Sequence, residues 1–161
     1  MHEGLKGFLA GVAVCVALAG CASAPPLPAP VRAGAAADEA AKRFETRPGV
    51  ARVYVYRSTR HGKDWPLMVS LGQTELGTVG AYSYMLLELP PGFHTLRARS
   101  EETASLELNL QAGRDYYVQL NVALSTAVGK PELLNMHPLE AQNSIRNECG
   151  LVVARAFGAT E

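Results

Sequence analysis

Hydrophobic and polar residues alternate in short segments from residue 50 onward, and glycine or proline separates most of these segments. A period of two is typical of β-strands that bury one face. The segments that show it are 52–57, 66–71, 74–79, 82–89, 93–99, 103–110 and 116–122, with 132–136 as a further candidate. About seven to eight short strands separated by turns predict a mainly β protein, an antiparallel β-sandwich.

Two of these segments carry the clearest face assignments. In 52–57, Val53 and Val55 alternate with Tyr54 and Tyr56, so we expect one aliphatic and one aromatic face. Residues 82–89 form the most apolar segment and are expected to lie centrally in a sheet. In 103–110, every second residue from position 106 is leucine, and these leucines are expected to point inward.

Helical patterns flank the predicted strands. Residues 38–48 contain good helix formers, with acidic residues first and basic residues later, and predict a short helix that ends before Pro48. Phe44, the large apolar side chain of this segment, is expected to pack on the domain. A second helix is predicted over 138–147, with Leu139, Gln142 and Ile145 at helical spacing. Residues 151–156 are expected to add a final extended piece that covers the sheet.

The N-terminal region has the pattern of an export signal. Residues 7–17 are uncharged and mostly apolar, as in the hydrophobic region of a signal peptide. The apolar run is shorter than the roughly 20 residues that a membrane-spanning helix needs. Residues 22–37 are almost entirely Ala, Pro, Gly and Val and predict a semi-extended spacer, in which ten residues would reach about 30 Å at ~3.1 Å per residue.

The four residues Leu18-Ala19-Gly20-Cys21 resemble the lipobox of bacterial lipoproteins. The resemblance implies cleavage before Cys21 and acylation of Cys21, with chains such as palmitate that anchor the protein in the membrane. Ala22, which is not acidic, favours the periplasmic face of the outer membrane. The alternative is an ordinary signal peptide cut near residues 22–24, which would leave a soluble protein. Cys15 is a poor rival to Cys21, because bulky Val14 precedes it.

These assignments divide the chain into a signal peptide (1–20), a lipidated cysteine with its linker (21–37), a short helix (38–48) and a β-sandwich domain with a C-terminal helix (50–161). The chain has 15 basic and 15 acidic residues and no net charge. Nucleic-acid binding normally requires a basic excess, so no nucleic-acid partner is expected. Cys149 has no cysteine partner after processing, so its thiol is either buried or paired between chains.

Three segments of the domain, 53–57, 89–96 and 113–118, read Val-Tyr-Val-Tyr-Arg, Leu-Pro-Pro-Gly-Phe-His-Thr-Leu and Gly-Arg-Asp-Tyr-Tyr-Val. With them the domain resembles a family of prokaryotic lipoproteins that carries a domain of unknown function. The Pro-Gly-x-His-x-Leu turn is also similar to PEGA-type modules, which are small transthyretin-like β-sandwiches. The resemblance implies the architecture and supplies no catalytic residue.

Recognisable catalytic and metal-binding patterns are missing from the sequence. His61, His94 and His137 lack the spacing of a zinc site, and no nucleophile elbow, phosphate-binding glycine loop or His-Glu-x-x-His pattern is present. We therefore expect no metal, no cofactor and no enzymatic activity. A periplasmic hydrolase with scattered site residues stays open as an alternative.

The candidate binding site is the segment 57–65, in which cations, a histidine and an indole fall in one predicted loop. Its residues are Arg57, Arg60, His61, Lys63 and Trp65. Such groups suit sugar-phosphate or peptidoglycan-like ligands, or an acidic protein patch. The alternative is a solvated loop in which Trp65 packs under the first hairpin. The sequence thus favours a non-catalytic envelope lipoprotein that contacts a protein or the cell wall, with a carbohydrate-binding module as the second hypothesis.

Overall fold

The computed structural model of the chain describes residues 26–123 and 129–155. Cys21 and the predicted signal peptide, residues 1–20, lie outside the described residues. The described part contains nine strands and two helices. They are α1 (Ala35–Ala41), β1 (Ala51–Arg57), β2 (Leu67–Leu71), β3 (Thr74–Val79), β4 (Ser83–Leu89), β5 (Gly92–Arg99), β6 (Thr103–Leu110), β7 (Asp115–Ala123), β8 (Lys130–Asn135), α2 (Pro138–Glu148) and β9 (Gly150–Val152).

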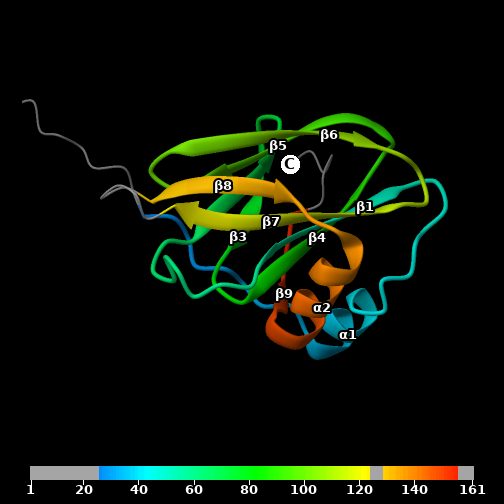
Figure 1. The fold of residues 1–161 in the computed structure, drawn as a ribbon, viewed down its shortest axis with the longest axis horizontal. Helices are drawn as coiled ribbons and strands as arrows, with labels where there is room; N and C mark the ends of the chain where they lie inside the picture. The colour runs from blue at the N-terminus through cyan, green and yellow to red at the C-terminus, as the bar shows by residue number, and fades with distance from the viewer. Residues whose placement is uncertain (1–25, 124–128, 156–161) are drawn as a thin grey trace, which may run out of the picture.

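The strands form two sheets that pack face to face, which confirms the predicted β-sandwich (Figure 1). The four-stranded sheet, in the order β3-β2-β5-β6, is antiparallel throughout. The five-stranded sheet, in the order β8-β7-β1-β4-β9, is mixed, because β1 pairs with β7 and β4 pairs with β9 in parallel. The expectation of purely antiparallel pairing therefore holds for only one sheet.

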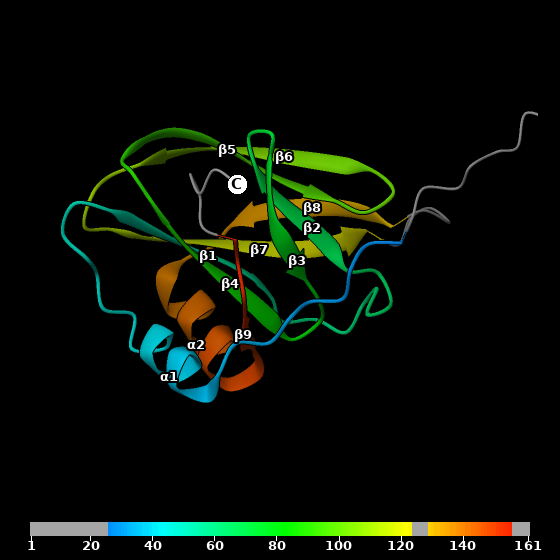
Figure 2. The same ribbon diagram turned by 180° about the vertical axis from the view of Figure 1, so that it is seen from behind.

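Strand β1 lies at the centre of the five-stranded sheet and is buried over its whole length. Val53 and Val55 face the aliphatic core between the two sheets, as their alternation predicts. Tyr54 and Tyr56 face the other way, toward α1 and α2. The helices thus form a third layer on the outer face of this sheet (Figure 2). The segment expected to be central, β4, is the neighbour of β1.

A cluster of aromatic rings fills the space between the sheet and the helices. The ring of Tyr54 lies 5.2 Å from the rings of both Phe44 and Tyr117. The hydroxyl group of Tyr54 donates to the carbonyl of Ala41 in α1, and the amide of Gln142 in α2 donates to the hydroxyl of Tyr117. Since buried phenols need partners, these bonds fix both helices on the sheet.

Helix α1 does not have the predicted bounds of 38–48. It begins at Ala35 and ends at Ala41, and Phe44 adopts a left-handed φ of +54° after the helix. Phe44 nevertheless packs on the domain as expected, against Tyr54. Burial of this ring in the aromatic cluster favours a turn over another helical turn, because continued helix would carry the ring away.

Helix α2 follows the prediction closely, but not its apolar stripe. Ala141 and Ile145 are its buried residues, whereas Leu139 is 74% exposed. Cys149, directly after the helix, is buried, in agreement with the first of its two expected states. Burial raises the pKa of its thiol to about 12, so the thiolate is strongly disfavoured.

The expected spacer is in part docked on the domain. The N–H of Ala33 donates to the carbonyl of Leu151 at 2.9 Å, and the N–H of Val153 donates to the carbonyl of Val31 at 2.8 Å. The guanidinium group of Arg32 also donates to the carbonyl of Tyr82. Composition argued against a role in the core, but backbone groups alone suffice to dock this segment beside β9.

A buried ion pair joins the parallel strands β1 and β7. Arg52 donates two hydrogen bonds, of 3.0 and 2.8 Å, to the carboxylate of Asp115, and both side chains are at most 9% exposed. Removing one partner leaves an uncompensated buried charge, whereas an apolar pair of similar volume avoids the desolvation cost.

We predict that Asp115→Ala lowers the free energy of unfolding by about 3–5 kcal/mol, while the double variant Arg52→Met, Asp115→Leu stays within roughly 1–2 kcal/mol of the original protein. Urea unfolding measures both. A single variant as stable as the double variant would contradict the role of the pair.

Asp38 connects α1 to the sheet and predicts a pH dependence. Partial burial favours the neutral acid, but bonds from Lys42, the Tyr84 hydroxyl and the Leu151 N–H outweigh this effect and hold the pKa of the carboxyl below its usual value. A lowered folded-state pKa stabilises the protein above the unfolded pKa of about 3.9, and this stability is lost as the pH falls through the folded-state pKa.

We therefore expect Asp38→Asn to destabilise the protein at pH 6 and to flatten the decrease of stability below about pH 4, measured by urea unfolding as a function of pH. The matched control is Glu39→Gln, which removes an exposed neighbouring carboxylate. If the stability of Asp38→Asn decreased below about pH 4 as steeply as that of the original protein, Asp38 would not be the source of this pH dependence.

Candidate functional site

The predicted binding loop connects β1 and β2, at the end of the sandwich where the chain enters at residue 26 (Figures 1 and 2). Arg57 is not available to a ligand there, because its side chain is fully buried. Its guanidinium group donates to the carbonyls of His61, Gly62 and Trp65, the last two at 2.7 and 2.8 Å. Burial lowers the pKa of this group, and among the described residues its Nε has no partner. The hydrogen bonds of Arg57 therefore hold the loop in its folded conformation.

The loop closes tightly around Arg57. Gly62 has a left-handed φ of +63°, and a methyl group on it would lie 2.9 Å from Nη2 of Arg57 and 3.1 Å from Cε3 of Trp65. Only glycine combines this backbone conformation with the missing volume. A methyl group on Gly129 would likewise lie 3.3 Å from Trp65. The indole thus lies close to both Gly62 and Gly129.

The remaining loop residues are on the surface. Arg60, His61 and Lys63 are exposed, and Trp65 is 36% exposed. Lys63 pairs with Asp64 at 2.6 Å, so its charge is largely compensated. Of the five predicted residues, the structure brings four to one exposed loop and places the fifth, Arg57, inside it. The correction has a simple cause: Arg57 is the last residue of the buried strand β1, and its side chain satisfies carbonyl groups of the turn.

The three histidines in the part of the chain that the structure describes, His61, His94 and His137, do not assemble a metal site. The imidazole of His94 lies 2.8 Å from the carbonyl of Pro90, next to the turn between β4 and β5. Within residues 26–123 and 129–155, no three His, Cys, Asp or Glu side chains gather so that they could hold a metal ion. Neither of the two helices in this part of the chain is long and apolar enough to span a bilayer.

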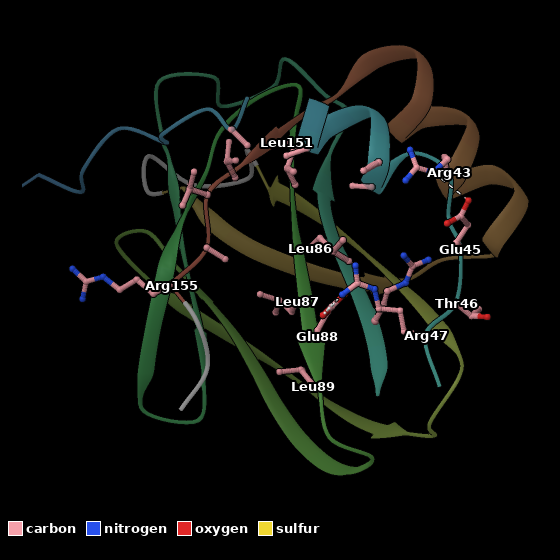
Figure 3. Close-up of a pocket in the computed structure, with 18 residues that line it drawn as sticks. Arg43, Glu45, Thr46, Arg47, Leu86, Leu87, Glu88, Leu89, Leu151 and Arg155 are labelled. Atoms are coloured by element: carbon pink, nitrogen blue, oxygen red, sulfur yellow. Dashed lines mark hydrogen bonds and ion pairs between the residues drawn. The ribbon is translucent and has the colours of Figure 1, made fainter. Parts of the chain in front are cut away.

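A groove that the sequence did not indicate lies along the outer edge of β4 (Figure 3). It has a volume of about 740 Å³, within the range of typical ligand clefts. One wall is α1 with the connection that follows it, and the other is the C-terminal segment 151–155. The floor is the second half of β4, residues 86–89. We call this feature the edge groove.

The edge groove exists because β9 is shorter than β4. Strand β9 pairs only with residues 83–85 of β4, and in the described part of the chain no strand continues this ladder beside residues 86–89. The second half of β4 therefore has a strand neighbour on one side only, β1. The sequence contains a weak sign of this gap, since the apolar segment after Gly150 is short.

Backbone directions in β4 follow from the ladder around β1. The N–H of Arg52 donates to the carbonyl of Arg114 beside β7, so even-numbered residues of β1 direct their backbone groups to β7 and odd-numbered ones to β4. The register pairs Val53 with Leu87, so odd-numbered residues of β4 bond to β1. The N–H and C=O of Glu88 consequently point away from β1, into the edge groove.

The rim of the edge groove is charged. Nη1 of Arg47 lies 2.9 Å from the carboxylate of Glu88, and Nε of Arg43 lies 3.1 Å from that of Glu45. Among the described residues, Arg43 forms hydrogen bonds only through Nε and Arg47 only through Nη1. The other guanidinium nitrogens of both arginines can still donate hydrogen bonds. Arg155 on the opposite wall is exposed, and its side chain points away from Arg43 and Arg47 (Figure 3).

We predict that Arg57→Met lowers the free energy of unfolding by roughly 2–4 kcal/mol, because three carbonyl groups lose a charged donor. Arg60→Ala, in the same loop but exposed, should change stability by at most about 0.5 kcal/mol. Urea unfolding compares the two variants. Equal stability of both would mean that Arg57 is not the residue that organises the loop.

Comparison with known proteins gives no family for this chain. No protein-family model matches it, and no curated protein matches its sequence. The fold and the two surface features, the loop and the edge groove, therefore carry the functional argument.

Proposed function

We propose that this chain is a lipid-anchored protein of the bacterial envelope, attached through Cys21 at the periplasmic face of the outer membrane, and that it acts by binding a partner. The observation that carries the proposal is the lipobox-like sequence Leu18-Ala19-Gly20-Cys21 directly after an uncharged apolar segment. Two or more acyl chains on this cysteine would anchor the protein stably, whereas one chain binds a membrane only marginally.

The docked N-terminal segment supports a location close to the bilayer. Residues 31–33 are bonded to the domain, and Val31 is the first of them. Ten peptide units connect Cys21 to Val31 and can span at most about 36 Å at ~3.6 Å per residue. An anchored domain would therefore stay near the membrane surface, and the end that carries Pro26 and the loop 58–66 would face it.

The edge groove supports the binding role. The connection that forms its wall, residues 42–50, lies at the end of the molecule opposite to Pro26 (Figures 1 and 2). In the anchored protein this end would point away from the bilayer, toward the periplasm. The exposed loop 58–66, the site expected from sequence, would instead lie on the membrane side, and the burial of Arg57 weakens the case for a carbohydrate site there.

The anchor is tested by expressing the full chain in a bacterial host with radiolabelled palmitate. We expect the original protein and the control Cys15→Ser to incorporate label and to fractionate with membranes, because Cys21 is intact in both. Cys21→Ser should lose the label and leave the membrane fraction. Labelled, membrane-bound Cys21→Ser would contradict the proposal, as would an unmodified thiol on the mature N-terminus in mass spectrometry.

A further inference from the structure

We propose that the open edge of β4 binds an extended peptide segment of a partner protein as an added strand, and that this segment alternates acidic and apolar residues. The inference deepens the binding role proposed above and does not depend on the lipid anchor. It rests on three properties of the edge groove: its unpaired backbone, its two chemically different walls and its unused arginine donors.

The unpaired backbone favours a strand over a compact ligand. The N–H and C=O of Glu88 and the C=O of Leu86 face the groove, and none of the described strands lies beside them. These groups repeat every two residues, about 6.8 Å, which is the spacing that an extended peptide presents. Strand addition to an exposed sheet edge uses main-chain bonds of this kind for affinity.

The two walls determine which side chains the added strand would carry. Leu86 and Glu88 lie on the helix side of β4, together with Arg43 and Arg47 on the connection after α1. Leu87 and Leu89 lie on the side of the aliphatic core. Since neighbouring strands place their side chains in register, every second residue of the peptide would meet the arginines and the others would meet apolar surface.

The arginine donors favour acidic residues at the first set of positions. Arg43 and Arg47 are 58% and 65% exposed, and each has guanidinium nitrogens beyond the one that bonds to its glutamate. A planar guanidinium group binds a carboxylate with two parallel hydrogen bonds. Of the four arginines that line the edge groove, Arg52 is paired with Asp115, Arg43 with Glu45 and Arg47 with Glu88, so Arg155 is the one without an ion pair among the described residues.

Residue 88 offers a matched pair of variants. Proline has no N–H, and at an edge position it leaves the bonds between β4 and β1 intact, so Glu88→Pro removes the donor that the added strand needs. Glu88→Ala removes the same side chain and its ion pair with Arg47 but keeps the N–H. The difference between the two variants isolates the backbone contribution.

For the test, a phage-displayed library of random heptapeptides is selected on the full chain in detergent, and the most enriched peptide is synthesised. We expect alternating acidic and apolar residues in that peptide. By fluorescence anisotropy it should bind the original protein, Cys21→Ser and Glu88→Ala within about threefold of one another. Its affinity for Glu88→Pro should be lower by about tenfold, as for one lost hydrogen bond. No enrichment, or equal affinity for Glu88→Pro, would overturn the proposal.

Amide hydrogen exchange gives a readout that needs no variant. The amide of Glu88 should exchange rapidly in the free protein and slowly in the peptide complex, while the amides of Leu87 and Leu89, bonded to β1, exchange slowly in both. A Glu88 amide that is protected without peptide, or that stays unprotected with it, would refute strand addition. Dimers that Glu88→Pro dissociates would show instead that a second copy occupies the edge. Cys21→Ser should bind the peptide normally although it lacks the lipid. The peptide test can therefore succeed or fail independently of the test of the anchor.

Discussion

The fold depends on one strand that is buried on both faces. Strand β1 contributes valines to the aliphatic core between the sheets and tyrosines to the cluster under the helices. Burial of one such aliphatic side chain stabilises a fold by about 1.5–3 kcal/mol, and β1 adds hydrogen bonds to a neighbour on each side. The four-stranded sheet packs on one face of β1 and the helices pack on the other. Neither can separate from the five-stranded sheet without exposing β1.

The same burial explains the two arginines of β1. Arg52 and Arg57 lie near opposite ends of a strand that excludes water, and a buried guanidinium group needs hydrogen-bond partners. Asp115, on the parallel neighbour β7, accepts two hydrogen bonds from Arg52, and three carbonyls of the following loop accept from the two Nη atoms of Arg57. One arginine thereby fixes the pairing of β1 with β7, and the other fixes the path of the chain out of the sheet.

Alternation along the chain predicted the strands and the two faces of β1, and the proline and helical spacing after residue 137 predicted the second helix. These features depend on neighbouring residues, which a single sequence contains. The parallel pairing of β1 with β7, the docking of residues 31–33 and the edge groove depend on which distant segments meet. For the same reason the sequence predicted all five residues of the loop 57–65 as one candidate binding site: its composition did not reveal that the side chain of Arg57 turns inward.

The two surface features of the molecule lie at opposite ends. The chain enters the described structure at one end, and the connection 42–50, part of which forms a wall of the edge groove, lies at the other (Figure 1). Both features involve β9. The docked segment 31–33 is bonded beside β9, and β9 pairs only with residues 83–85 of β4. The docked segment 31–33 thus lies next to β9, the short strand that leaves the second half of β4 without a neighbour in the edge groove.

Native-state amide hydrogen exchange tests the role of β1 most directly. The amides of β1 should be the slowest in the domain and should exchange only through global unfolding, whereas those of α1 should also exchange through local opening. Exchange of the β1 amides at the rate of the α1 amides, with a free energy well below that of global unfolding, would contradict the account.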